Sequence, residues 1–376
     1  MQDRSFVLAV AIDMADTGQK PGLDPEEAAS VNQTETFLQP VGRKRYRLSL
    51  QLLKFNQGEG KDEAKTYVIS NTGESFFEMI RDMLGQSSKS LWFEHVQLII
   101  ISEAVLKQAG LAEILDFFKR DSEMRSRIKI YITPDTARSL LEYIPPSKEP
   151  GGIYLADLIR LHGRNNHVAG ARTDLGYTVR YLDTNSNILL PRIRIADKVV
   201  KLDGAAVFKK DKFLGYADGY TIAGIKFIYG TEESAIVTAE SPGRPGHQMA
   251  FELYQDDTKF MPHVEGGNIY FTLDLKMYGN IGEIQGNIGE ENTLDPAFIH
   301  QLELAFAEEI KQNILHSDHF FRQEMGVDCI SKFAAKMKAH EPVVWEQVKD
   351  QWDEICPSIP LIVSVNVSIR GVGSHK

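Results

Sequence analysis

Two segments of the chain alternate apolar and other residues so regularly that each is predicted as a β-strand with one buried face. Residues 269–277 place large apolar side chains at every odd position, and residues 361–369 place aliphatic ones there. Successive side chains of a strand point to opposite faces of a sheet, so a period of two predicts a sheet that is covered on one side. This pattern fixes the architecture of the C-terminal part more tightly than any other feature.

Three predicted helices lie between those two strands. The first begins at Asp295-Pro296, a favourable N-cap followed by proline at the first helical position. The second is centred near Phe333 and the third begins at Pro342. With further strands expected at 235–240 and 249–255, residues 229–376 are predicted to form an antiparallel sheet plus three helices, with the helices on one face of the sheet.

The N-terminal part alternates short apolar runs with helical patterns. Strands are expected at 6–13, 45–55, 65–69, 96–101 and 128–132, and helices near 74–84, 104–107 and 111–119. The run at 96–101 is continuously apolar, as in a strand that is covered on both faces. Residues 1–145 are therefore predicted to form a mixed α/β domain.

A proline- and glycine-rich segment at 143–152 interrupts these patterns and is interpreted as a linker. After it we expect a helix at 154–162, polar loops, a strand at 188–195, and a hairpin formed by 202–208 and 213–215. These elements define a middle α+β domain at 153–228. The whole chain is thus predicted to be α+β, with three mixed α/β domains.

Net charge and hydropathy argue against several functional classes. The formal net charge is -10, which argues against a nucleic-acid partner because such proteins present a basic surface. No apolar run approaches the roughly 18 residues that span a bilayer, and no secretory signal precedes the first predicted strand. We expect no enzymatic activity, no cofactor and no metal.

The motifs that suggest chemistry are all weak. A Gly-Asn-Ile-Gly-Glu sequence at 279–283 recurs at 286–290 and is interpreted as a strand end with a bulged turn, because no lysine and no helix follow as in a phosphate loop. The His-Ser-Asp-His sequence at 316–319 is interpreted as an exposed helix end, since a metal needs more convergent ligands. Cys329 and Cys356 are expected to be buried or half-buried thiols, with a disulfide left open.

Several stretches, taken together and in order, resemble the Ger(x)C family, the C subunit of the nutrient germinant receptors of endospore-forming bacteria. They are Gly73-Glu74, Phe93-Glu94-His95-Val96, Leu115-Asp116, the stretch 120–125, the stretch 202–215 with its continuation to 226, and the closing pattern of Gly326, Trp345, Trp352 and the strand through Gly371. Each stretch alone is only moderately specific. Together they cover nearly the whole chain.

The resemblance implies a non-enzymatic lipoprotein that assembles with two integral-membrane receptor subunits at the outer face of the spore inner membrane. The family carries a signal peptide and a lipid-modified cysteine just before the first strand. Met1 stands at about that place here, so we expect a form from which the anchor has been removed. An extracytoplasmic protein that binds the nutrient directly and a lipoprotein that contacts peptidoglycan are the alternatives.

Four residues are candidates for contact with a partner: His95, Arg120, Asp121 and Lys210. The competing interpretation is structural. His95 would then bond to backbone or to a carboxylate such as Asp116, and Arg120 and Asp121 would pair locally at a helix end. We expect the region 202–224 and the first domain to form the docking surface.

Overall fold

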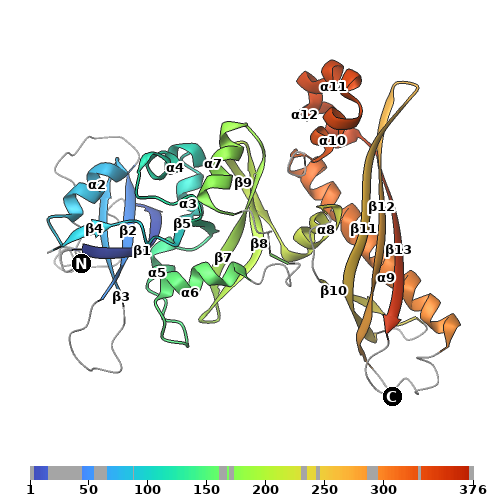
Figure 1. Cartoon of the computed structure of the whole chain (residues 1–376), viewed down its shortest axis with the longest axis horizontal. Coiled ribbons are helices and arrows are strands. Elements are labelled where there is room, and N and C mark those ends of the chain that lie inside the picture. The colour runs from blue at the N-terminus through green and yellow to red at the C-terminus, as the bar shows by residue number, and fades with distance from the viewer. Residues whose placement is uncertain are drawn as a thin grey trace, which may run out of the picture. The chain divides into compact units, whose positions relative to one another are not determined.

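The computed structural model describes residues 4–15, 45–54, 66–87, 89–160, 167–168, 173–229, 235–242, 246–285, 295–328 and 332–371. They group into two compact units (Figure 1). The first unit comprises Met1–Arg160, Arg172–Leu202 and Ala206–Gly215, and the second comprises Leu161–Ala171, Asp203–Ala205 and Tyr216–Lys376.

The first unit is built on a nine-stranded sheet with the order β3-β2-β1-β5-β6-β7-β8-β9, in which β4 also pairs with β1. The strands are β1 (Arg4–Met14), β2 (Tyr46–Leu53), β3 (Thr66–Gly73), β4 (Ser90–Trp92), β5 (Leu98–Ser102), β6 (Lys129–Thr133), β7 (Ile188–Ala196), β8 (Val199–Lys209) and β9 (Lys212–Ala217). The central strands β1, β5, β6 and β7 run parallel, whereas β2 is antiparallel to β1. Every residue of β5 is buried, which confirms the strand predicted from the apolar run.

The helices of this unit are α2 (Phe76–Met83), α3 (Glu103–Leu106), α4 (Leu111–Arg120), α5 (Ala137–Leu141), α6 (Gly151–Asp157) and α7 (Leu175–Asp183). Asp13, at the end of β1, ties the sheet to α5. Its carboxylate accepts hydrogen bonds from the backbone N–H groups of Ala137 at 2.7 Å and Arg138 at 2.9 Å. Burial raises the pKa of Asp13, because the low-dielectric interior disfavours the charged form.

The segment interpreted as a linker instead begins helix α6 and packs against the sheet. The side chain of Gln51 donates to the Leu141 carbonyl at 2.6 Å and accepts from the Gly152 N–H at 2.7 Å. A β-carbon at Gly152 would lie 2.7 Å from that of Ala9, so glycine is required by the close approach. The predicted boundary therefore does not divide the structure. Strands β7–β9 extend the first sheet, and two units are found where three domains were predicted.

The second unit contains a four-stranded sheet with the order β10-β11-β12-β13. The strands are β10 (Ala235–Glu240), β11 (Gln248–Glu265), β12 (Asn268–Ile284) and β13 (Leu361–Gly371). The predicted antiparallel arrangement is confirmed for β10, β11 and β12, but β13 runs parallel to β12. The reason is the helical crossover between β12 and β13, which returns the chain to the end of the sheet where β12 began.

The helices of the second unit are α8 (Gly219–Tyr229), α9 (Pro296–His319), α10 (Lys332–His340), α11 (Pro342–Val348) and α12 (Trp352–Ile355). Helix α9 covers one sheet face. Its side chains Leu302, Phe306, Ile310 and Ile314 are buried, and the ring of Phe306 stacks on Phe251 at 4.9 Å. The apolar stripe predicted for this helix is thereby confirmed. The third predicted helix is divided into α11, a 3₁₀ turn and α12.

Helix α8 packs against α9 at very short range. A β-carbon at Gly224 would lie 2.1 Å from Ser317 Oγ and 2.4 Å from the Asn313 carbonyl oxygen. Ser317 Oγ donates to the carbonyl of Thr221 at 2.8 Å, and Asn313 Nδ2 donates to that of Tyr220 at 2.8 Å. Helix α8 can therefore approach α9 this closely only because residue 224 has no side chain.

None of the helices among the described residues combines the length and the apolar character needed to cross a membrane.

Candidate interaction surface on helices α4 and α7

Helix α4 separates an apolar side from a charged side. Leu111, Ile114, Leu115 and Phe118 are buried, as the helical spacing of the apolar residues requires. Asp116, Lys119 and Arg120 are exposed. The helix therefore anchors three charged side chains rigidly at the surface of the first unit.

Helix α7 forms the second half of the surface, and the sequence analysis missed it by assigning this segment to polar loops. Asp174 caps the helix, since its side chain accepts a hydrogen bond from the Tyr177 N–H at 2.9 Å. Leu175 and Thr178 are buried. The Asp174 cap followed by apolar residues was the available signal, but only two buried positions in nine residues make the stripe too short to stand out.

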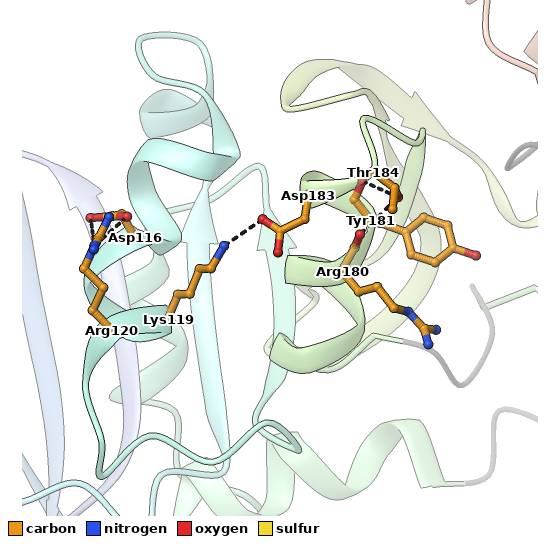
Figure 2. A network of polar contacts seen from close by, with 7 residues as sticks. All are labelled: Asp116, Lys119, Arg120, Arg180, Tyr181, Asp183 and Thr184. Atoms are coloured by element: carbon orange, nitrogen blue, oxygen red, sulfur yellow. Dashed lines mark hydrogen bonds and ion pairs between the residues drawn. The ribbon is translucent and has the colours of Figure 1, made fainter.

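An ion pair joins the two helices. Lys119 Nζ lies 2.6 Å from Asp183 Oδ1, as Figure 2 shows between the α4 and α7 ribbons. On α4 itself, Arg120 Nε donates to both carboxylate oxygens of Asp116, at 2.9 and 3.0 Å. That hydrogen bond lowers the pKa of Asp116 below its ordinary value. We call this surface, formed by Asp116, Lys119, Arg120, Arg180, Tyr181, Asp183 and Thr184, the α4–α7 face.

Aromatic rings lie beside these charges. The rings of Tyr177 and Tyr181 are 4.1 Å apart between centroids, and the Arg180 guanidinium lies 5.4 Å from the centre of the Tyr177 ring. Tyrosine and arginine are enriched at protein–protein contacts because they combine apolar area with hydrogen-bonding capacity. The α4–α7 face thus offers both charged and aromatic contact groups.

Of the four candidate contact residues, the structure brings Arg120 into the face and gives Asp121 a structural role. The Asp121 carboxylate accepts from the Glu123 N–H at 2.8 Å and so shapes the turn after α4. His95 is exposed, and its ring meets Phe6 edge-on at 4.8 Å between centroids. Asp116, the carboxylate suggested as a partner for His95, is engaged by Arg120 instead.

Lys210 lies at the opposite end of α4 from Arg120. It occupies the turn of the β8–β9 hairpin with a φ of 59° and is exposed. The next residue, Asp211, accepts a hydrogen bond through its carbonyl from the Leu111 N–H at 2.8 Å. A helix of ten residues is about 15 Å long, so Lys210 and Arg120 border the two ends of one surface element. The predicted hairpin itself is confirmed.

Two stretches that carry the family resemblance are bonded to each other. The Phe93 N–H donates to Glu123 Oε2 at 2.9 Å, and Arg125 Nη2 lies 3.5 Å from Glu94 Oε2. These contacts fasten the turn before β5 to the turn before β6.

The weak chemical motifs have structural roles in the second unit. The stretch 316–319 forms the last turn of α9, and both histidines are exposed, as the interpretation as an exposed helix end requires. Ser317 and Asp318 are buried instead, because they face α8 and the elements after α9. Residues 279–283 lie in β12, where Gly279 approaches the Glu252 carbonyl too closely for a side chain. Residues 286–290 lie outside the described residues.

Cys356 is a free, buried thiol, as expected, and burial raises its pKa. Cys329 lies outside the described residues. No group of three or more histidine, cysteine or acidic side chains in the described part of the chain could hold a metal ion.

A hollow of about 650 Å³ opens in the second unit near the β11–β12 turn. Its lining is mainly aliphatic and includes Ile269, Val348, Ile355 and Ile362. Ile362 itself is 56% exposed. A polar nutrient needs convergent hydrogen-bonding groups for recognition, so this hollow suits apolar contact better than nutrient binding.

Comparison with known proteins gives consistent matches along the chain. Residues 1–195 match the family model described as the N-terminal domain of spore germination proteins, and residues 203–373 match the model described as spore germination B3/GerAC-like, C-terminal. Spore germination protein YndF of Bacillus subtilis strain 168 is 27% identical over 323 residues, covering 84% of this chain and 78% of that protein. Spore germination protein KC of the same strain is 24% identical over 342 residues, covering 84% and 82%.

Among solved structures, the crystal structure of the GerBC protein matches with a TM-score of 0.59 and 18% identity. The match covers 87% of this chain and 94% of that one. At this identity the likeness establishes a shared fold.

Proposed function

This chain belongs to the Ger(x)C family of spore germination proteins, and on that premise we propose that it is the lipoprotein subunit of a nutrient germinant receptor. Membership gives it a role in spore germination. In the proposed role it catalyses no reaction and assembles with two integral-membrane subunits at the outer face of the spore inner membrane.

The observation that carries the proposal is the α4–α7 face. Side chains of both signs and two tyrosine rings in tilted contact are held on helices whose opposite sides are buried in the first unit. Exposed ion pairs contribute little to stability, roughly 0–1 kcal/mol each. They can therefore exchange partners, and complementary charges would guide the approach of a second protein and fix its orientation.

Charge reversal tests the docking surface. We expect Arg120→Glu combined with Lys210→Glu to reduce recovery of the chain with the membrane subunits about tenfold, because both ends of α4 would then repel an acidic partner surface. Recovery is measured by affinity purification of the tagged chain from detergent-solubilised spore membranes that contain the whole receptor.

Arg138→Glu is the matched control. Like Arg120, Arg138 forms an exposed ion pair with an acidic residue four positions away in the sequence, and its Nε lies 2.8 Å from Glu142 Oε1. Arg138 lies on α5, outside the α4–α7 face. Circular dichroism and melting temperature establish that each variant is folded. Unchanged recovery of the double variant, with its fold intact, contradicts docking through the α4–α7 face, as does equal loss in the α5 control.

Lipid anchoring is tested separately on the complete gene product. We expect radioactive palmitate to label the protein in sporulating cells and the label to disappear when the acceptor cysteine is replaced by serine. A single acyl chain holds a protein only weakly, whereas a multiply acylated anchor retains it at the membrane. Absence of label would remove the lipoprotein part of the proposal and leave the assembly part to its own experiment.

A direct nutrient sensor predicts a different result. Titration of amino acids and sugars would raise the melting temperature of the purified chain, since a ligand that binds only the folded state stabilises it. We expect no shift.

A further inference from the structure

Within the described part of the chain, strand β13 has a strand on one side only, so a row of its backbone hydrogen-bonding groups faces outward on the other. It is the last strand of its sheet and pairs with β12. The Pro360 carbonyl accepts from the Phe271 N–H of β12, whereas the Ile369 N–H points to Glu303 of α9. Backbone groups of a strand alternate in direction, so the odd-numbered residues from 361 to 369 direct their N–H and C=O groups away from β12.

One end of this edge is already occupied. Glu303 Oε1 accepts a hydrogen bond from the Ile369 N–H at 3.0 Å, and the pairing with β12 shifts register just beyond that residue. The outward positions that precede it are Leu361, Val363, Val365 and Val367. Their centre is Ser364.

Residues 361–369 of this edge lack the features that normally prevent strand edges from pairing, whereas the register shift and Arg370 come after them. Natural edge strands are short, or carry lysine, proline or a bulge. Residues 361–369 have no charge and no proline, and Ile362 is 56% exposed. The opposite edge strand, β10, has six residues and ends in Glu240, whereas β13 has eleven. Such an edge is a template for another strand.

We propose that two copies of this protein associate through antiparallel pairing of their β13 strands about a two-fold axis at Ser364. Val363 then faces Val365 of the second copy, and Leu361 faces its Val367, each as a hydrogen-bonded pair. Ser364 of one copy faces Ser364 of the other as a non-hydrogen-bonded pair. This register uses the outward positions that precede Ile369 and leaves the bond to Glu303 intact.

The occupant is a second copy because the strand is complementary to itself in this register. Aliphatic residues meet aliphatic residues on the side that α9 covers, and Ser364 and Asn366 meet uncharged residues on the other. No like charges oppose each other. The two four-stranded sheets become one continuous sheet, in which the outward N–H and C=O groups of the two paired β13 strands bond to each other.

Disulfide trapping tests the register. In a Cys329→Ser background we expect Ser364→Cys to form a covalent dimer rapidly on mild oxidation. Antiparallel non-hydrogen-bonded pairs have α-carbons about 4.5 Å apart, within the range that a disulfide spans. Asn366→Cys is the matched control: it lies on the same face, two residues along. The two copies of residue 366 would be about 13 Å apart along the strands, so cross-linking should be much slower.

Sedimentation equilibrium measures the association itself. We expect the unmodified chain to dimerise and Ser364→Lys to raise the dissociation constant at least about fivefold, because two ammonium groups would face each other across the axis. Thr238→Lys on β10 places the same charge on the other exposed edge and should leave the constant unchanged. A monomeric chain throughout the micromolar range overturns the proposal. So does equal cross-linking of the two cysteine variants.

Discussion

The same pair of residues, at the same helical spacing, occurs in both units with opposite surroundings. Asp116 and Arg120 on α4 have side chains that are 52% and 75% exposed, whereas Asp318 and Arg322 in the second unit are 7% and 2% exposed. Both arginines donate to the aspartate four residues before them. The two pairs share the residue types and the sequence spacing but differ in burial and in backbone, because Arg322 lies in a π-helical turn, Phe320–Glu324, directly after α9.

The buried pair belongs to a larger network. Arg322 Nη1 donates to the carbonyls of Cys356 at 2.6 Å and Ile359 at 2.7 Å, and its guanidinium lies over the Phe333 ring. Asp328 accepts from the backbone N–H groups of Phe333 and Ala334 and from Trp352 Nε1. These bonds join α9, α10 and α12. The exposed pair is accessible to solvent and, in the function proposed above, to a partner, whereas the buried pair joins elements of the fold.

The largest expected difference follows from removing the arginine. Arg322→Ala should lower the free energy of unfolding of the second unit by about 3–5 kcal/mol, because it leaves the Asp318 charge buried and unpaired. Arg120→Ala should leave the free energy of unfolding nearly unchanged, because exposed pairs at this spacing contribute little. Urea unfolding followed by tryptophan fluorescence measures each variant in its own unit. A Trp92→Phe background lets Trp345 and Trp352 report on Arg322→Ala in the second unit, and a Trp345→Phe/Trp352→Phe background lets Trp92 report on Arg120→Ala in the first. A loss below 1 kcal/mol for Arg322→Ala would contradict the comparison.

The second-largest expected loss of stability comes from adding one methyl group at Gly224, beside the buried network. Gly224→Ala should destabilise the second unit by about 1–3 kcal/mol, because its β-carbon would overlap Ser317 and the α9 backbone. Gly282→Ala is the control, since its nearest neighbour would lie 3.7 Å away, and should change stability by less than about 0.5 kcal/mol. Thermal unfolding of the two variants compares them directly; similar values would mean that α8 can move away from α9.

The two regions should also respond to pH with opposite signs. Burial raises the folded-state pKa of Asp328 above 3.8, so its contribution to stability is fully present below that value and is lost as pH rises through the folded pKa. The pKa of Asp116 is lowered, so its contribution is present above 3.8 and is lost as pH falls through the folded pKa.

Comparison with Asp328→Asn and Asp116→Asn isolates these contributions. As pH falls from 7 toward 4, the unmodified protein should gain stability relative to Asp328→Asn, by at most about 1.4 kcal/mol per pH unit. Relative to Asp116→Asn it should stay constant over that range and lose stability only at lower pH. Urea unfolding at several pH values provides the measurement, and slopes of the same sign for both variants would refute the assignment.

The smallest expected effect concerns the pair that joins α4 to α7. A double-mutant cycle of Lys119→Ala and Asp183→Ala should give a coupling of about 0.2–1 kcal/mol that decreases in 1 M salt, because exposed charges are screened. The corresponding cycle for Asp318 and Arg322 should be larger and nearly independent of salt. A coupling between α4 and α7 that resists salt would show that this contact is fixed in place and less available to a partner.

Sequence patterns predicted the elements whose apolar residues repeat clearly. The stripe of α9 and the alternation in β12 and β13 were both confirmed. Helix α8 escaped detection because the residues from Thr221 to Ile228 are all buried, so its apolar residues show no one-sided period. Helix α7 escaped because its buried stripe is short. The α4–α7 face was therefore only half predictable: Arg120 was proposed, but Asp183 and Tyr181 were not.

The sequence by itself determined the strand and helix periodicities and the similarity of its ordered stretches to the Ger(x)C family, since these depend on residues close together in the chain or on their order. Tertiary structure alone decided that β13 runs parallel to β12, that β7–β9 extend the first sheet, and that Arg322 is buried while Arg120 is exposed. The physical reason is that these outcomes depend on which distant segments cover a given residue. The Asp–Arg spacing is the same in both pairs, so it cannot indicate which pair is buried.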